Sequence, residues 1–217
     1  MKTMKGLNFK APITDRMAVI RPFVAQGSVL DLGVVDSRRL RHDTLDRLAK
    51  KPNLLFRQIC EINVQAFGVD IDDEGIEILR QQGFHVQTAD VVTMSLEQRF
   101  DTIIAGEIIE HLDNPGQFLR NMGRHLTPTG TLIISTPNPF YCKQIWKILR
   151  RNQPSVHEEH TCWFDPSTLS HLCRMSGLDP YAIYWLQSKK QLFKTWPQFF
   201  RTYFSHSFMV LAKQAQP

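Results

Sequence analysis

Short apolar runs alternate with helix-like segments along most of this chain, and this alternation limits the fold more than any other feature. The runs are rich in Val, Ile and Phe, and most of them end at Gly, Asp or Pro. Continuous apolar strands separated by helices are typical of a parallel sheet that is buried on both faces. We therefore predict an α/β fold. The runs are SVLDLGV (28–34), VQAFGVDI (64–71), GFHVQTAD (83–90), FDTIIAGE (100–107) and GTLIISTP (130–137).

Capping residues and apolar spacing predict the helices between these runs. Asp165 precedes a proline and Gly177 follows the last apolar position, which is the usual start and stop of a helix. Two later runs, YAIYWLQ and SFMVLAK, predict further strands. The predicted helices are 73–82, 114–126, 166–176, an amphipathic helix within 136–151, one or two helices within 35–63, and a segment around 13–26 that Pro22 interrupts.

The turn after the first run raises the question of the ligand. The run ends in Asp31-Leu32-Gly33, as nucleotide-binding strands do, but Val34, Val35 and Asp36 stand where such turns usually carry more glycine. The second run ends at Asp70. A carboxylate at that place can accept hydrogen bonds from both ribose hydroxyls of an adenosine ligand. Dinucleotides and S-adenosylmethionine both match this pairing.

The composition of the turn favours S-adenosylmethionine. A dinucleotide places its pyrophosphate against bare backbone amides at a helix N-terminus. Two valines would hinder that approach, and Asp36 would repel the phosphates. S-adenosylmethionine carries no phosphate, and its amino group and sulfonium are cationic, so a nearby carboxylate is tolerated. The alternative is that 29–34 is an ordinary core strand with no ligand.

Several motifs together resemble a class I S-adenosylmethionine-dependent methyltransferase. They are VLDLG, GVDID, TAD and FDTIIAGEIIEHLDNPGQFLRNMGRHLTPTGTLIISTPNPF, and the similarity runs from about residue 27 to 187. Ubiquinone-pathway O-methyltransferases, small-RNA 3′-end 2′-O-methyltransferases and enzymes of bacterial glycan and natural-product clusters are similar at E-x-x-E-H and S-T-P-N. The resemblance implies a Rossmann-like three-layer sandwich with seven strands, the last antiparallel. It also implies one domain over 1–217, with an N-terminal helical segment (1–26) and acceptor-side helices (138–180).

The resemblance also implies which residues hold the cofactor. Asp70 would bind the ribose and Ile71 would lie against the adenine. Asp90 would meet the adenine amino group, with Val91 beside it. The family usually has a second glycine two places after Gly33, where this chain has Val35, so the group that holds the amino acid end stays open between Asp31 and Asp36. The methionine portion and sulfonium would lie against Gly33, Gly106 and Glu107.

Methyl transfer to a hydroxyl requires alignment of the nucleophile and removal of its proton. His111, after the fourth strand, is the first candidate for the base, and the alternative is a His that packs in its loop. Glu110 and His160 are the further catalytic candidates. His157 could also reach the site. Trp163 and Phe164 could line an acceptor pocket or staple the helix after them.

A metal-dependent variant stays open beside this interpretation. In the RNA-methylating relatives a metal site uses the E-x-x-E-H positions and a later His, and residues here match by type: Glu107, Glu110, His111 and His160. Many relatives keep the string without metal. We therefore predict no metal.

Composition sets weaker limits. The net charge of +5 with a pI near 9.1 is consistent with ordinary surface charge or an anionic partner. Four cysteines without a CxxC pair predict reduced thiols and a cytoplasmic protein, and no apolar stretch predicts a membrane span.

We predict O-methylation of a small-molecule or glycan-type hydroxyl. The alternatives are an RNA-end 2′-O-methyltransferase, a non-catalytic S-adenosylmethionine-binding protein and, more remotely, an NAD-dependent oxidoreductase; nucleic acid is the less favoured partner.

Overall fold

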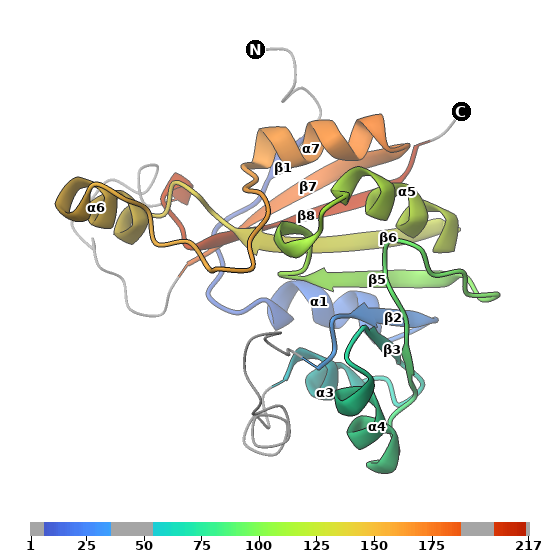
Figure 1. Ribbon diagram of the computed structural model, residues 1–217. Coiled ribbons are helices and arrows are strands. Elements are labelled where there is room, and N and C mark those ends of the chain that lie inside the picture. The colour runs from blue at the N-terminus through green and yellow to red at the C-terminus, as the bar shows by residue number, and fades with distance from the viewer. Residues whose placement is uncertain (1–6, 36–53, 188–201, 216–217) are drawn as a thin grey trace.

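A computed structural model describes residues 7–35, 54–187 and 202–215 of the chain. These residues form an eight-stranded sheet in the order β1-β7-β8-β6-β5-β2-β3-β4 (Figure 1). The α/β fold is confirmed, and so is the antiparallel last strand, because β8 pairs antiparallel with both β6 and β7. The sheet has one strand more than predicted, since Asn8–Phe9 adds a short parallel edge strand beside β7.

The predicted strands are all present in the described part of the chain, with bounds within a few residues of the apolar runs. The strands are β1 (Asn8–Phe9), β2 (Val29–Leu32), β3 (Phe67–Asp70), β4 (Val86–Thr88), β5 (Phe100–Gly106), β6 (Leu126–Pro137), β7 (Leu178–Leu186) and β8 (Ser207–Gln214). The helices are α1 (Met17–Val24), α3 (Leu55–Cys60), α4 (Asp73–Gln81), the 3-10 turn η1 (Ile109–His111), α5 (Pro115–His125), α6 (Cys142–Arg151) and α7 (Pro166–Met175).

Helices cover both faces of the sheet, which explains why the strand sequences are apolar without alternation. Ile103 and Ala105 of β5 join a core cluster with α5 and α7, whereas Ile104 joins a second cluster with α1, α3 and α4. Successive strand residues point to opposite faces, so a strand covered on both sides must be apolar throughout. Figure 1 shows α5 and α7 on one side of the sheet and α1, α3 and α4 on the other.

The helix ends follow the expected capping chemistry. Asp165 accepts from the backbone amides of two residues in the first turn of α7, and the side chain of Asn114 caps α5 by accepting from the amide of Gln117. The expected interruption at Pro22 does not occur, because α1 continues through it to Val24. Four buried side chains hold α1 against the sheet, and this packing outweighs the one backbone hydrogen bond that a proline removes.

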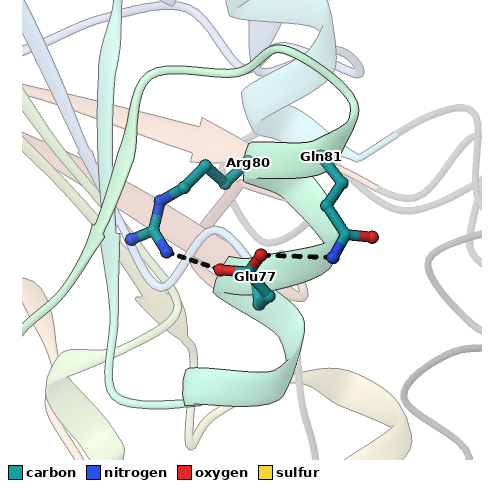
Figure 2. Close-up of polar contacts among 3 residues, drawn as sticks. All are labelled: Glu77, Arg80 and Gln81. Atoms are coloured by element: carbon teal, nitrogen blue, oxygen red, sulfur yellow. Dashed lines mark hydrogen bonds and ion pairs between the residues drawn. The ribbon is translucent and has the colours of Figure 1, made fainter.

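Helix α4 has an exposed polar face and a buried apolar face. Glu77 accepts hydrogen bonds from Arg80, at 2.6 Å, and from Gln81, at 3.1 Å (Figure 2). Ile76 and Leu79 on the opposite face are fully buried. The exposed contacts contribute little to stability, so the buried face fixes the position of α4 against β3.

The parallel strands bring the candidate site residues to one edge of the sheet. Strands β2, β3 and β5 run in the same direction and end at Leu32, Asp70 and Gly106. The residues that follow them therefore meet at the carboxyl edge, where open α/β sheets bind their ligands. Of the predicted helical segment 35–63, residues 36–53 lie outside the described residues, and the rest includes α3.

Candidate active site

The turn after β2 depends on one glycine. Gly33 has a φ of +73°, a backbone conformation that side chains other than glycine rarely adopt. Its amide donates to the carbonyl oxygen of Val69 in β3 at 2.9 Å. An added Cβ would meet only the Ile108 side chain, at 3.4 Å, so the backbone angle rather than a lack of space requires glycine here.

The two valines of the turn pack into the core. Val34 and Val35 are 3% and 2% exposed. A Cβ built at Gly68 would lie 2.9 Å from Cγ1 of Val34, and one at Gly75 would lie 2.2 Å from Cγ1 of Val35. The glycines missing from the turn are therefore replaced by glycines on β3 and α4, which make room for the valine side chains. The bulk of the valines does not stand at the surface of the turn, so it does not by itself keep out a phosphate.

Asp70, at the end of β3, is held by two backbone amides. Its Oδ2 accepts from the amide of Val35 at 2.8 Å, and its Oδ1 accepts from the amide of Asp72 at 3.1 Å. Burial raises the pKa of the Asp70 carboxyl, and the two amide hydrogen bonds oppose that rise. A carboxylate oxygen can accept more than one hydrogen bond, so each oxygen retains capacity for a hydroxyl group. The Val35 amide thus links the unusual turn directly to Asp70.

A second carboxylate, Asp31, lies on the α1 face of β2. It is 2% exposed, and its Oδ1 has no hydrogen-bond partner among the described residues. Burial raises the pKa of Asp31 to about 7, and the positive charge of Arg16 opposes the rise. Arg16 stands at the start of α1, and a Cβ built at Gly106 would lie 3.8 Å from its Nη1. An unpaired acceptor and a guanidinium thus meet beside the ends of β2 and β5.

The candidate adenine-side residues occupy the ends of β3 and β4. Ile71 is 53% exposed, although it follows a buried strand. Asp90 is exposed and accepts from the amide of Val92 at 2.8 Å and from the Thr93 hydroxyl at 3.2 Å, so it shapes its own turn. Val91 is buried in the core on the α5 face. Asp36 lies outside the described residues.

Strand β5 ends in a strained turn. Glu107 has a φ of +55°, which is uncommon for a residue other than glycine, and its amide donates to the carbonyl oxygen of Ser135 at 2.9 Å. Strained backbone of this kind is found most often at functional sites, where the surrounding structure holds it in place. The preceding residue is Gly106. A Cβ built there would lie 3.1 Å from the Leu55 side chain.

Glu110 is buried behind this turn. It is 1% exposed, and its Oε2 accepts from the Thr136 hydroxyl at 2.9 Å, while its Oε1 has no partner among the described residues. Burial raises the pKa of Glu110 to about 7. Its carbonyl oxygen accepts from both the amide and the hydroxyl of Thr161. Glu110 therefore fastens the segment around 157–162 to η1.

That attachment gathers three imidazoles. The ring centroid of His111 lies 4.7 Å from that of His160 and 5.9 Å from that of His157. The Nδ1 atom of His111 lies 3.2 Å from the carbonyl oxygen of Glu159. Burial lowers the pKa of His111 and lowers that of His160 to about 4, so both rings are neutral at pH 7.

The cluster differs from the metal set that the resemblance offers. Ligand atoms of His111, His157 and His160 all lie within 4.8 Å of one another. In the described part of the chain, these three side chains form the group that could hold a metal ion. Neither Glu107 nor Glu110 belongs to this group, and the side chain of Glu110 is turned to Thr136. Three imidazole nitrogens suit a transition metal ion by their chemistry.

The acceptor side also contains the two predicted aromatic residues. Phe164 is 8% exposed and packs in the core with α7, so it holds the start of that helix. Trp163 is 41% exposed. Of this pair, Trp163 has the surface available for a ligand.

Sequence reasoning missed three contributors to this site. Arg16 is an isolated charge far from any motif, and only the packing of α1 brings it to Gly106. Gly68 and Gly75 are each next to a recognisable motif, but their role depends on which way the two valines point. A purely local pattern does not contain that information.

Comparison with known proteins identifies the family of the chain. Residues 37–183 match a family described as a methyltransferase domain. The chain therefore belongs to that family, and it is a class I S-adenosylmethionine-dependent methyltransferase domain with S-adenosylmethionine as its cofactor.

The four described cysteines are free, and no helix in the described part of the chain is both long and apolar enough to cross a bilayer.

Two curated relatives and one solved structure are similar to this chain. The chain is 31% identical over 78 residues to a ubiquinone biosynthesis O-methyltransferase of Caulobacter sp., covering 36% of this chain and 29% of that protein. It is 36% identical over 67 residues to the Azorhizobium caulinodans protein of the same name, covering 31% and 24%. A S-adenosylmethionine-dependent methyltransferase from Archaeoglobus fulgidus superposes with a TM-score of 0.62 at 16% identity, covering 92% and 91%. The matches thus span under a third of these two curated relatives.

Proposed function

We propose that this domain transfers the methyl group of S-adenosylmethionine to a hydroxyl oxygen of a small-molecule or glycan-type acceptor. The observation that carries the proposal is the pair of backbone hydrogen bonds that fixes Asp70 beside the Gly33 turn. The two curated relatives, both named as O-methyltransferases, support oxygen as the acceptor atom. The neutral imidazoles at the same edge of the sheet supply a base for a hydroxyl.

In this proposal the nucleoside end of the cofactor lies over β3 and β4. Each oxygen of Asp70 accepts one backbone amide and one ribose hydroxyl. Ile71 covers one face of the adenine, which accounts for an exposed isoleucine beside a buried strand. Asp90 meets the adenine amino group, and Val91 supports it from the core.

The amino acid end lies over Gly33 and Gly106. Asp31 accepts from the ammonium group through its unpartnered Oδ1, and Arg16 pairs with the carboxylate. This assignment places opposite charges together at both groups of the zwitterion. The sulfonium then lies beside Glu107, at the turn that leads to the imidazole cluster.

His111 is the proposed base. A carbonyl oxygen only accepts, so the contact with Glu159 puts the proton of the neutral ring on Nδ1 and leaves the lone pair on Nε2. The acceptor hydroxyl gives its proton to that Nε2 as its oxygen bonds to the methyl carbon. The carbon–sulfur bond breaks at the same time, and its electron pair stays on sulfur as the thioether of S-adenosylhomocysteine. The ring of His160 stands nearly perpendicular to that of His111 and helps to orient it.

Glu110 acts in this proposal as a positioning residue. Its side chain is buried against Thr136, and its backbone carbonyl oxygen accepts from Thr161 in the segment that carries His157 and His160. A metal-assisted form of the same reaction is the second candidate, and the grouping of the three imidazoles is the observation in its favour. The proposed reaction needs no metal, and the two forms differ in their response to a chelator.

The test is a transfer assay with isotopically labelled S-adenosylmethionine, in the presence and absence of EDTA. The acceptors are catechols and free glycosides, each paired with its hydroxyl-blocked analogue. We expect label on oxygen, a loss of about 100-fold or more in kcat/KM for His111→Gln, and little change for the neighbouring His157→Gln. Equal losses in both variants together with inhibition by EDTA would establish the metal-assisted form instead. Transfer to the blocked analogues would refute a hydroxyl acceptor.

A further inference from the structure

Helix α6 differs from the other helices of the described chain because it buries no side chain. Each of the other α-helices there buries at least two residues. Trp146 is 59% exposed and Leu149 is 74% exposed. Figure 1 shows α6 projecting from the end of the sheet, beyond β6. A helix with one apolar face normally buries that face.

The sequence of α6 separates two kinds of side chain. With 100° between successive residues, the apolar residues occupy an arc of about 160° and the basic residues an arc of about 100° opposite it. The helix contains four cations and no carboxylate. The apolar residues are Cys142, Ile145, Trp146, Ile148 and Leu149, and the basic residues are Lys143, Lys147, Arg150 and Arg151.

Other exposed apolar residues gather beside α6. Of the eleven large hydrophobic residues that are exposed in the described chain, six fall between residues 140 and 163. Phe140, before the helix, is 42% exposed and contacts the Tyr203 ring at 5.8 Å. The N-terminal end of α6 is fixed to the body, because the side chain of Asn138 donates to the carbonyl oxygens of Tyr203 and Ser205. The patch is therefore held in place relative to the sheet.

We propose that α6 docks this domain on the surface of an anionic phospholipid bilayer. The apolar arc enters the acyl boundary while the four cations lie at the level of the phosphates, as in helices that lie in the membrane interface. The charge of the helix is complementary to anionic headgroups, since no carboxylate of α6 opposes them. At about 15 Å, the helix is too short to span a bilayer, so it lies on the surface.

Docking through α6 also has a consequence for the site. Helix α6 follows the end of β6, and β6 is parallel to β5, whose carboxyl edge carries Gly106 and Glu107. The candidate site therefore opens at the end of the sheet from which α6 projects. A bilayer bound at α6 would lie near that opening, and acceptors held in the bilayer would reach it.

The experiment measures co-sedimentation of the full chain with vesicles of phosphatidylcholine alone and with phosphatidylglycerol added. We expect at least about tenfold stronger partitioning to the anionic vesicles. Lys143→Glu with Arg150→Glu should reduce that partitioning by at least about tenfold. The matched control is Arg21→Glu with Lys213→Glu, which changes the net charge equally on α1 and β8, outside α6, and should bind much as the parent does.

A second variant tests the apolar arc. Trp146→Gln with Leu149→Gln should lose partitioning, whereas Met175→Gln, at a residue 69% exposed on α7, should retain it. Equal binding to both vesicle types, no binding, or full binding by the α6 variants would overturn the proposal. So would a dimer in sedimentation velocity that depends on Trp146 and Leu149 while vesicles are ignored. S-adenosylhomocysteine binding, measured on every variant, reports folding and tests the methyltransferase assignment separately.

Discussion

The packing of Val35 against Gly75 leads to a stability prediction that can be worked from distances. In Gly75→Ala, the new methyl carbon would lie 2.2 Å from Cγ1 and 2.8 Å from Cγ2 of Val35. Ordinary carbon contacts are about 3.5–4.0 Å, so one of the two elements must shift. Overpacking of this kind costs about 1–3 kcal/mol. The better helix propensity of alanine returns at most about 1 kcal/mol.

The expected net effect is a loss of about 1–2 kcal/mol in the free energy of unfolding, which corresponds to a drop of several degrees in Tm for a chain of this size. Urea denaturation of Gly75→Ala, Val35→Ala and the double variant measures it. The double variant should be more stable than the sum of the single losses predicts, with a coupling of at least about 1 kcal/mol. Gly123→Ala is the control, since its Cβ would lie 3.6 Å from its neighbour. A Gly75→Ala variant as stable as the parent would refute the packing described for the turn.

Two further predictions concern charge. Because the pKa of His160 is lowered from 6.5 to about 4, the folded state resists protonation, so its contribution to stability is complete above pH 6.5 and is lost as pH falls toward 4. The free energy of unfolding of His160→Gln should therefore fall less than that of the parent over this interval; the same slope in both proteins contradicts the assignment. Arg16→Gln should weaken S-adenosylhomocysteine binding about tenfold or more, measured by calorimetry, but should leave adenosine binding unchanged. Equal weakening of both ligands would remove Arg16 from the carboxylate.

The fold could be predicted because its strongest signal is local. A strand covered on both faces must be apolar along its length, so residues such as Ile103 and Ile104 identify the sheet before any tertiary contact is known. The short edge strand Asn8–Phe9 escaped prediction because two exposed residues carry no such signal. The prediction that Pro22 interrupts the helix was wrong for a related reason. The packing that holds α1 together across Pro22 is not visible in the helix sequence.

The site was predictable only where a residue follows the end of a strand. That rule predicted Asp70, because parallel strands deliver their carboxyl ends to one edge, whereas the family resemblance implied Gly106 and Glu107. The partners of these residues were not. The Val35 amide that binds Asp70 belongs to a turn whose path the sequence left open, and the imidazole cluster needed a loop that returns to Glu110 from about 50 residues away.

Titration calorimetry with S-adenosylhomocysteine measures whether Asp70 binds the ribose of an adenosine cofactor. Loss of two hydrogen bonds to a charged acceptor, at about 1.5–3 kcal/mol each, should weaken binding at least about 100-fold in Asp70→Ala. Asp179→Ala, on the exposed far end of β7, should bind as the parent does. The parent should bind the ligand and Asp70→Ala, still folded by circular dichroism, should not at comparable concentration. A folded Asp70→Ala that binds within about threefold of the parent would show that Asp70 does not hold the ribose.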